Sequence, residues 1–381
     1  DIKRLSFFRL NENLIIAIAF PLLTIQLLGS VWLLGEEPQQ HGSGPHDYLF
    51  LSKPSPNLVL NTGEKIPSIG LGTLPAWYIP GYKPEIVGDA VRTALKQGYR
   101  HIDAAWIYEN EEHVGAAIAE SIQRGVVERQ DLFVTTKLWN TFHDPADVRG
   151  ALEESLRKLR LDYVDLYLVH WPVAQKKGTG RYDSGPGTLA DVPMADTWRA
   201  MEDLQRAGLA RSVGVSNMGV KGLRELLDTA RVRPAVNQVE CHPYLPQWEL
   251  VRFCREQGVV VSCYSPLGNP GRTKRPAGEP AVWEDPAVLA VARRTNSTAA
   301  QVLLRWALAR GTSVIPKSVT EARLLENLLA AQKPLGLADW REVSAAGERV
   351  SIRYGKADRF LREGQAPEDF WSESYASDTA A

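Results

Sequence analysis

Four side chains that could transfer protons or stabilise charge follow short apolar stretches: Asp103, Tyr108, Lys137 and His170. A phenol has a pKa of about 10, roughly three units too high for a good acid at neutral pH. The ammonium of Lys137 would favour the phenolate and lower this pKa, and Asp103 could keep the ammonium charged and oriented. His170 could donate a hydrogen bond to a carbonyl oxygen. Together these groups could polarise a carbonyl and protonate the alkoxide formed by hydride attack.

Each of these residues also has a purely structural interpretation. Asp103 could be a solvated strand end and Tyr108 a core tyrosine. Lys137 could be a solvated lysine at a strand end, or a nucleophile that forms a Schiff base with a carbonyl substrate. His170 could be a core histidine with satisfied hydrogen bonds. No metal site is expected, because one histidine and one aspartate are too few ligands.

Short apolar segments alternate with amphipathic ones along most of the chain. The predicted strands begin near Ile69, His101, Leu132, Val164, Arg211, Val236, Val259 and Ser313. The helices between them are predicted at Glu85–Lys96, Glu111–Arg124, Pro145–Lys158, Thr197–Arg206, Val220–Ala230, Trp248–Gln257 and Thr298–Ala309. No strand is followed by G-x-G-x-x-G, which disfavours a doubly wound dinucleotide fold. Eight such units predict an α/β fold, a parallel (β/α)8 TIM barrel, preceded by a β-hairpin at 58–67.

From the second strand onward, every predicted strand ends in polar residues. In a (β/α)8 barrel the carboxyl ends of the strands meet on one face, where active sites are found. The sequence therefore predicts that one face gathers these strand ends: Asp103, Lys137, His170, Ser216-Asn217, Asn237-Gln238 with Glu240, Tyr264-Ser265 and Lys317-Ser318.

The N-terminal part differs from the rest of the sequence. Leu14–Leu34 contains no charged residue and is long enough to cross a bilayer as a helix. Basic residues precede it and acidic residues follow it, which predicts a single membrane span with a cytosolic N-terminus. A signal-peptide core, a buried helix or a wrongly joined upstream piece are the alternatives. The predicted organisation is an N-terminal segment (1–36), a Gly- and Pro-rich linker (37–56) and a catalytic domain (57–381).

Composition excludes some classes of function. The chain has 381 residues, 44% of them hydrophobic, and a formal net charge of -1. Without a basic excess, no nucleic-acid partner is expected. Three cysteines form neither a metal-binding spacing nor a disulfide framework, as in proteins of a reducing compartment. Without the anchor, the expected location is the cytoplasm.

The spacing of Asp103, Tyr108, Lys137 and His170 resembles the catalytic tetrad of the aldo-keto reductases. The resemblance covers roughly Leu58 to Phe360. Its further motifs include Leu71-Gly-Thr73, Lys137-Leu-Trp-Asn140, Gly214-Val-Ser-Asn217, Asn237-Gln-Val-Glu-Cys-His-Pro243, Tyr264-Ser-Pro-Leu267 and Ile315-Pro-Lys-Ser318. The stretches at 237–243 and 264–268 look most similar to plant-type members of the family.

This resemblance implies an NADPH-dependent enzyme with Tyr108 as the proton donor. Ser216, Asn217 and Gln238 would hold the nicotinamide, and Tyr264 would stack on it. The rest of the cofactor would contact Thr73, Ser265, Leu267, Lys317, Ser318, Arg323, Glu326 and Asn327. The substrate pocket would be lined by Trp106, Trp139 and Trp171.

The sequence departs from the family pattern in the segments that normally choose the substrate. Leu74 stands where most relatives have Trp, and Trp77 could take over its position. The sequences of the loop Gly268–Glu284 and the tail Lys356–Ala381 also depart from the family pattern. The expected function is the reduction of small aldehydes or ketones to alcohols by a monomer. The alternative is a regulatory subunit that binds the cofactor on the same barrel without significant turnover.

Overall fold

The computed structural model describes residues 44–51, 53–75, 82–180, 183–272 and 275–371, all within one compact unit, 40–381. Eight parallel strands form one sheet in chain order: β3 (Leu71–Gly72), β4 (His101–Asp103), β5 (Phe133–Leu138), β6 (Val164–Val169), β7 (Ala210–Ser216), β8 (Val236–Glu240), β9 (Val260–Tyr264) and β10 (Ser313–Val314). The predicted hairpin is also present, as the antiparallel pair β1 (Asn57–Val59) and β2 (Lys65–Pro67).

The two ends of the sheet approach each other. Ile69 and Val314 form a parallel bridge. The amide of Gly70 donates to the carbonyl of Val314, and the amide of Val314 donates to the carbonyl of Ser68, both at 2.8 Å. This curled sheet of eight strands is consistent with the predicted (β/α)8 fold.

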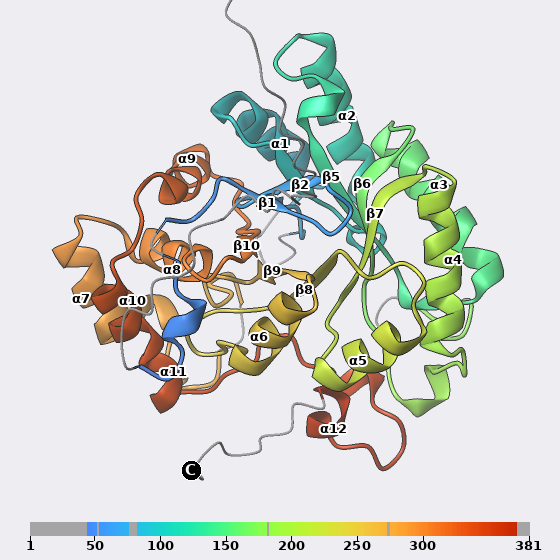
Figure 1. Cartoon of the computed structure of the whole chain (residues 1–381). Coiled ribbons are helices and arrows are strands. Elements are labelled where there is room, and N and C mark those ends of the chain that lie inside the picture. The colour runs from blue at the N-terminus through green and yellow to red at the C-terminus, as the bar shows by residue number, and fades with distance from the viewer. Residues whose placement is uncertain (1–43, 52, 76–81, 181–182, 273–274, 372–381) are drawn as a thin grey trace, which may run out of the picture. The chain divides into compact units, whose positions relative to one another are not determined.

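Helices follow the strands and surround them (Figure 1). Their bounds are α1 (Glu85–Gln97), α2 (Glu111–Gln123), α3 (Pro145–Leu159), α4 (Met194–Arg206), α5 (Val220–Thr229), α6 (Trp248–Glu256), α7 (Pro286–Arg294), α8 (Ala299–Leu308) and α9 (Glu321–Leu329). The C-terminal part adds α10 (Leu337–Ser344), α11 (Ala346–Arg349) and α12 (Pro367–Trp371). The last barrel helix, α9, packs against the first, α1.

Local sequence explains how the strand that carries Lys137 is supported from outside. Helix α3 begins where Asp144 accepts a hydrogen bond from the amide of Ala146 at 3.0 Å, with Pro145 in the first turn. It ends at Arg160, which adopts a left-handed conformation (φ 57°). Leu152 on its inner face is fully buried in the main core. The helix therefore begins and ends at defined residues and packs against β5.

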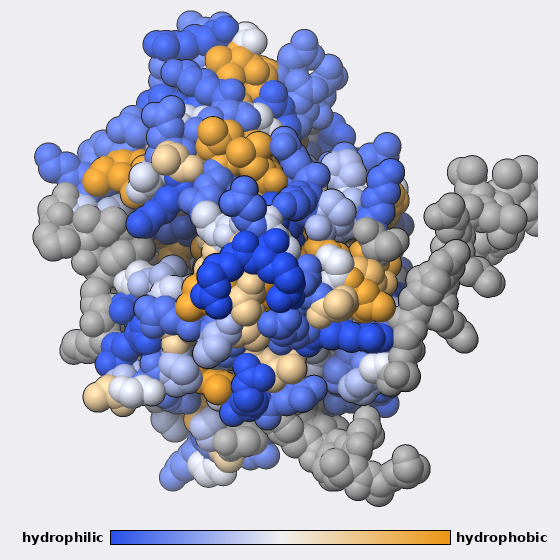
Figure 2. Space-filling model, turned by 90° about the vertical axis from the view of Figure 1, so that its left-hand side faces the viewer, coloured by the Kyte–Doolittle hydropathy of each residue, from blue (hydrophilic) through white to orange (hydrophobic). Residues whose placement is uncertain are grey.

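Apolar packing differs at the two ends of the sheet. Leu60 and Ile66 of the hairpin pack with Phe133 and Val236, which lie at the amino ends of β5 and β8. The hairpin therefore covers this end with hydrophobic side chains and leaves the opposite end for polar residues. On the side shown in Figure 2, hydrophobic residues form small groups among hydrophilic ones.

Part of the interval predicted as a linker packs against the barrel. The 3-10 helix η1 (Asp47–Leu49) places Leu49 in the core with no exposed surface. His46 stacks on Trp248 with ring centroids 4.3 Å apart, and Asp47 pairs with Arg341. The predicted membrane span, Leu14–Leu34, lies outside the described residues. Among the residues that are described, no helix combines the length and apolar character that a membrane crossing requires.

Candidate active site

A buried ion pair forms the centre of the site. Lys137 lies on β5, and Asp103 ends the neighbouring strand β4. The Nζ atom of Lys137 lies 2.6 Å from Oδ1 of Asp103 and donates a second hydrogen bond to the carbonyl of Ala104 at 2.8 Å. The side chain of Lys137 has no exposed surface and that of Asp103 is 2% exposed. Each charge therefore depends on the other for compensation.

Tyr108 and His170 approach this pair from two further elements. The 3-10 helix η2 (Trp106–Tyr108) follows β4 and carries the Tyr108 ring to 5.2 Å from Nζ of Lys137, measured to the ring centroid. His170 follows β6, and its ring meets that of Tyr108 edge to face with centroids 5.9 Å apart. All four predicted catalytic residues are thus brought together at the carboxyl ends of β4, β5 and β6.

The protonation states differ in one respect from the sequence-based expectation. Burial raises the pKa of Tyr108 well above 10, and the charge of Asp103 raises it further. The net shift is therefore upward and not downward as expected, because burial and Asp103 outweigh the attraction of Lys137 for the phenolate, and the sequence does not reveal this burial. Burial also lowers the pKa of Lys137, against the attraction of Asp103. It lowers the pKa of His170 well below 6.5, with Lys137 and Arg359 contributing. At neutral pH Tyr108 is a phenol and His170 a neutral imidazole.

A hydrogen-bonded network surrounds these residues. Gln238 donates to Oδ2 of Asp103 at 2.7 Å, so both carboxylate oxygens of Asp103 are bound. Asn217, at φ 59°, donates to the carbonyl of His170 at 2.9 Å and accepts from the hydroxyl of Tyr264 at 2.7 Å. Ser216 donates to the carbonyl of Gln238 at 2.7 Å. The residues predicted to hold a nicotinamide therefore lie together at the ends of β7, β8 and β9.

A cavity of about 380 Å³ opens above this network. Tyr108, His170, Trp139 and Trp171 line it, and the Trp139 ring packs edge to face on His170 at 5.3 Å. Other predicted site residues along its wall are Asp103, Ser216, Asn217, Gln238, Tyr264, Ser265, Leu267 and Lys317. Two aromatic walls and a polar floor suit a small carbonyl compound.

A second cavity of about 660 Å³ adjoins the first, since both are lined by Leu267, Pro270, Gly271 and Lys317. Ser318 and Arg323 line it at the start of α9, as do Glu326 and Asn327 further along this helix. The two adjoining cavities therefore extend from the tetrad to the N-terminal turn of α9, where Lys317 and Arg323 supply positive charge.

Two predicted residues lie elsewhere. The indole of Trp106 donates to Glu154 at 3.0 Å and packs on Phe142 at 4.8 Å, and Trp106 does not line the cavity. Thr73 does not line the cavity either. Its hydroxyl donates to the backbone carbonyl of Asp103 at 2.9 Å and so helps to hold this residue in position. Leu74 lines the cavity, whereas Trp77 lies outside the described residues.

The tail from Lys356 onward was expected to influence substrate choice, but the sequence named no individual residue of this C-terminal segment as part of the site. Tyr354, Gly355 and Arg359 line the cavity, and Phe360 packs against Trp171 with ring centroids 5.0 Å apart. This segment has neither helical nor strand periodicity, so no local pattern reveals where it folds back. The sequence identified Glu240 as a polar residue at a strand end but did not indicate any structural or catalytic role for it.

Comparisons with known proteins agree with this geometry. The sequence model of the Aldo/keto reductase family matches residues 68–348. The chain is 48% identical over 268 residues to aldo-keto reductase family 4 member C11 of Arabidopsis thaliana, covering 70% of this chain and 82% of the relative. It is 46% identical over 275 residues to aldo-keto reductase family 1 member A1 of Gallus gallus, covering 71% and 82%.

The structure is similar to that of the aldose reductase from Schistosoma japonicum, with a TM-score of 0.74 and 38% sequence identity, covering 83% of this chain and 99% of the other. The chain belongs to the aldo/keto reductase family and is an oxidoreductase that acts on carbonyl groups. The predicted likeness to plant-type members is confirmed, since a plant protein is among these relatives.

Proposed function

We propose that this enzyme reduces aldehydes or ketones to alcohols with NADPH as the hydride donor and Tyr108 as the proton donor. The observation that carries the proposal is the Asp103–Lys137 pair, buried beneath the Tyr108 ring and facing His170 at the floor of a cavity. A regulatory subunit without turnover would have no need to bury a charged pair at this position.

The two adjoining cavities fit the two halves of a dinucleotide. Ser216, Asn217 and Gln238 would hold the carboxamide of the nicotinamide, and the Tyr264 ring would stack on its face. Along the path towards α9, the remaining cofactor contacts would come from Ser265, Leu267, Lys317, Ser318, Arg323, Glu326 and Asn327. When bound, the reduced nicotinamide supplies the hydride.

Preference for NADPH would arise at the far end of this path. The 2′-phosphate of NADPH carries most of two negative charges, which favour a guanidinium and a helix N-terminus. Arg323 lies in the first turn of α9 and Lys317 precedes that helix, and both line the second cavity. The same pair offers no comparable partner to the 2′-hydroxyl of NADH.

The protein groups then divide the proton chemistry between them. Neutral His170 can donate a hydrogen bond to the substrate oxygen and polarise the carbonyl. Because burial raises its pKa, Tyr108 keeps its proton until a stronger base forms beside it, and an alkoxide is a much stronger base than a phenolate. After the transfer, the buried ammonium of Lys137 attracts the new phenolate, and charges in a protein interior interact more strongly than in water.

Turnover by the purified full-length chain tests the proposal. Loss of the absorbance of NADPH with a simple aldehyde is the expected result. Binding of NADPH without any loss of absorbance across a series of aldehydes and ketones would instead favour the regulatory alternative. Trapping of a substrate adduct on Lys137 by borohydride would favour the Schiff-base alternative.

A further inference from the structure

Glu240 is a buried carboxylate at the carboxyl end of β8, two residues beyond Gln238, and is 1% exposed. It accepts hydrogen bonds from the backbone amide of Tyr354 at 2.8 and 3.1 Å and from that of Gly355 at 2.5 Å. The Nε2 atom of His242 donates a further hydrogen bond at 2.8 Å. One side chain of the barrel therefore holds two consecutive amides of the C-terminal segment.

These contacts meet the hydrogen-bonding needs of both the Glu240 carboxylate and the backbone amides of the C-terminal segment. Residues 350–357 form neither helix nor strand, so the partly buried amides of Tyr354 and Gly355 take their acceptor from elsewhere in the protein. A buried carboxylate is costly unless it is hydrogen-bonded, and hydrogen bonds to an ionised acceptor are stronger than neutral ones. An apolar residue could fill the same space, but it could not fix the position of this segment.

The segment held by Glu240 forms part of the cavity wall. Tyr354, Gly355 and Arg359 line the cavity, and Phe360 packs on Trp171. Two further backbone contacts among the described residues flank the one made by Glu240. The amide of Ile352 donates to the carbonyl of Tyr244, and the carbonyl of Arg359 accepts from the amide of Gly185.

The fit at Gly355 leaves no room for a side chain. A Cβ atom at this position would lie 2.6 Å from the hydroxyl oxygen of Tyr264 and 3.0 Å from Oε2 of Glu240. The segment thus touches both Glu240 and the ring expected to stack on the nicotinamide. Tyr354 extends the contact on its other side, where the guanidinium of Arg272 lies 4.8 Å from its ring centroid.

We propose that Glu240 is a positioning residue: its carboxylate fixes the segment from Tyr354 to Phe360 as the substrate-side wall of the cavity, and this wall makes the enzyme discriminate in favour of larger carbonyl substrates that contact it. The inference rests on the proposed carbonyl reduction. Small aldehydes react at the floor without touching the wall, so they do not depend on it. Larger aldehydes gain binding energy from the wall only while it is held in place.

Glu240→Gln is the direct perturbation. The amide keeps the size of the side chain but replaces one acceptor oxygen with an NH2 group, which cannot accept from a backbone amide. Gly355→Ala displaces the same segment by steric contact and leaves the carboxylate unchanged. If the position of the wall is what matters, both variants raise KM for a large aldehyde.

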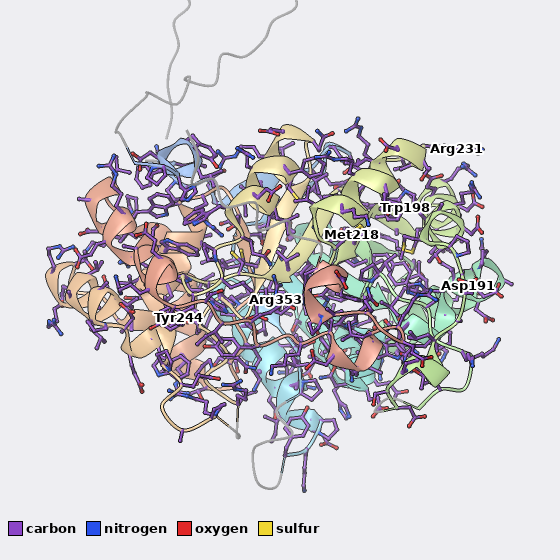
Figure 3. The ribbon with its side chains drawn as sticks, turned by 90° about the horizontal axis from the view of Figure 1, so that it is seen from below. Asp191, Trp198, Met218, Arg231, Tyr244 and Arg353 are labelled. Carbon is purple, nitrogen blue, oxygen red and sulfur yellow. The ribbon has the colours of Figure 1, made fainter. Side chains whose placement is uncertain are left out.

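Glu202→Gln is a matched control. Glu202 is also buried, at 2% exposure, and accepts hydrogen bonds from two consecutive backbone amides, those of Arg231 at 2.7 Å and Val232 at 2.9 Å. Figure 3 shows Arg231 close to Trp198 of α4 at the edge of the molecule, well separated from Arg353, which directly precedes Tyr354. This substitution removes the same kind of interaction far from the cavity.

The assay compares 2-naphthaldehyde with propanal, both with NADPH. In Glu240→Gln and Gly355→Ala, KM for naphthaldehyde should rise about tenfold. This corresponds roughly to the free energy of one hydrogen bond to a charged group. In Glu240→Gln, kcat and KM for propanal should stay near the wild-type values. Gly355→Ala tests only the KM for naphthaldehyde, because its added Cβ would also press on the hydroxyl of Tyr264. Hydrogen exchange of the amides of Tyr354 and Gly355 should accelerate in Glu240→Gln, in the absence of any substrate. Glu202→Gln should change none of these quantities.

Three results would overturn the proposal. The first is an equal loss of kcat/KM for both aldehydes in Glu240→Gln. The second is a Glu202→Gln variant whose KM values and hydrogen exchange match those of Glu240→Gln. The third is unchanged hydrogen exchange at Tyr354 and Gly355 in Glu240→Gln. A wild-type enzyme that turns over neither aldehyde would instead refute the proposed function. The exchange measurement still decides the role of Glu240 in that case, because it requires no activity.

Discussion

Replacing Lys137 with methionine separates the structural and chemical roles of the buried pair. Lys137→Met leaves the Asp103 carboxylate buried, with Gln238 as its remaining side-chain partner. Removing one member of a buried ion pair typically costs about 3–5 kcal/mol of stability. We therefore expect the free energy of unfolding to fall by that amount.

The chemical effect can be estimated from the geometry. The ammonium lies 5.2 Å from the centre of the Tyr108 ring. At this distance, with an effective dielectric constant of about 20, attraction of the phenolate is worth roughly 3 kcal/mol. Loss of this attraction should lower kcat by about a hundredfold.

A double variant distinguishes the two effects. Lys137→Met/Asp103→Asn contains no buried charge at this position and retains the amide partner of Gln238. Its stability should recover most of the loss, because replacing both partners of a buried pair is often nearly neutral. Its kcat should stay low, because the charge that stabilises the phenolate is still absent.

Urea unfolding and steady-state kinetics of the wild type, the single variant and the double variant provide the measurements. Recovery of near wild-type kcat in the double variant would refute the reasoning, since Lys137 would then serve only to neutralise Asp103. An unchanged free energy of unfolding in the single variant would equally contradict the description of a charged buried pair.

Three further predictions concern other parts of the protein. Arg323→Ala should weaken NADPH binding by about 1.5–3 kcal/mol and leave NADH binding nearly unchanged in fluorescence titrations; equal losses would mean that Arg323 supports the fold. Burial lowers the pKa of His143 to about 3, so between pH 6.5 and 3 the unfolded chain binds a proton that the native state does not. Stability should therefore fall on acidification, and His143→Asn should reduce the loss between pH 7 and pH 5 by about 2 kcal/mol in urea unfolding; an unchanged loss would refute this. Asp47→Ala breaks a partly exposed ion pair with Arg341, so it should cost about 0.5–1 kcal/mol in low salt and less in high salt, with kcat unchanged. A salt-independent loss would contradict this assignment.

Residues whose positions follow from regular periodicity could be predicted from the sequence. Alternation of apolar and amphipathic segments locates the strands and helices, and a barrel then gathers the strand ends. Asp103, Lys137 and His170 lie on or directly after strands, so the order of the strands alone brings them together. The N-terminal hairpin follows from two short strands around a glycine-containing turn.

Features that depend on long-range packing could not be predicted in this way. The tail segment is held by Glu240, more than a hundred residues earlier, and its own sequence contains no sign of that contact. Trp106 is next to the tetrad in sequence, yet η2 turns its indole towards Glu154. The raised pKa of Tyr108 depends on burial, which spacing along the chain does not reveal.

Tyr108→Phe, assayed with NADPH and a simple aldehyde, tests the central claim most directly. Only a hydroxyl is lost, so the fold and the dissociation constant for NADPH should be unchanged when measured on the same sample. Because general acid catalysis typically contributes about 10²–10⁴-fold, kcat should fall by at least about a hundredfold. Near-full turnover by Tyr108→Phe would contradict the assignment of Tyr108 as the proton donor.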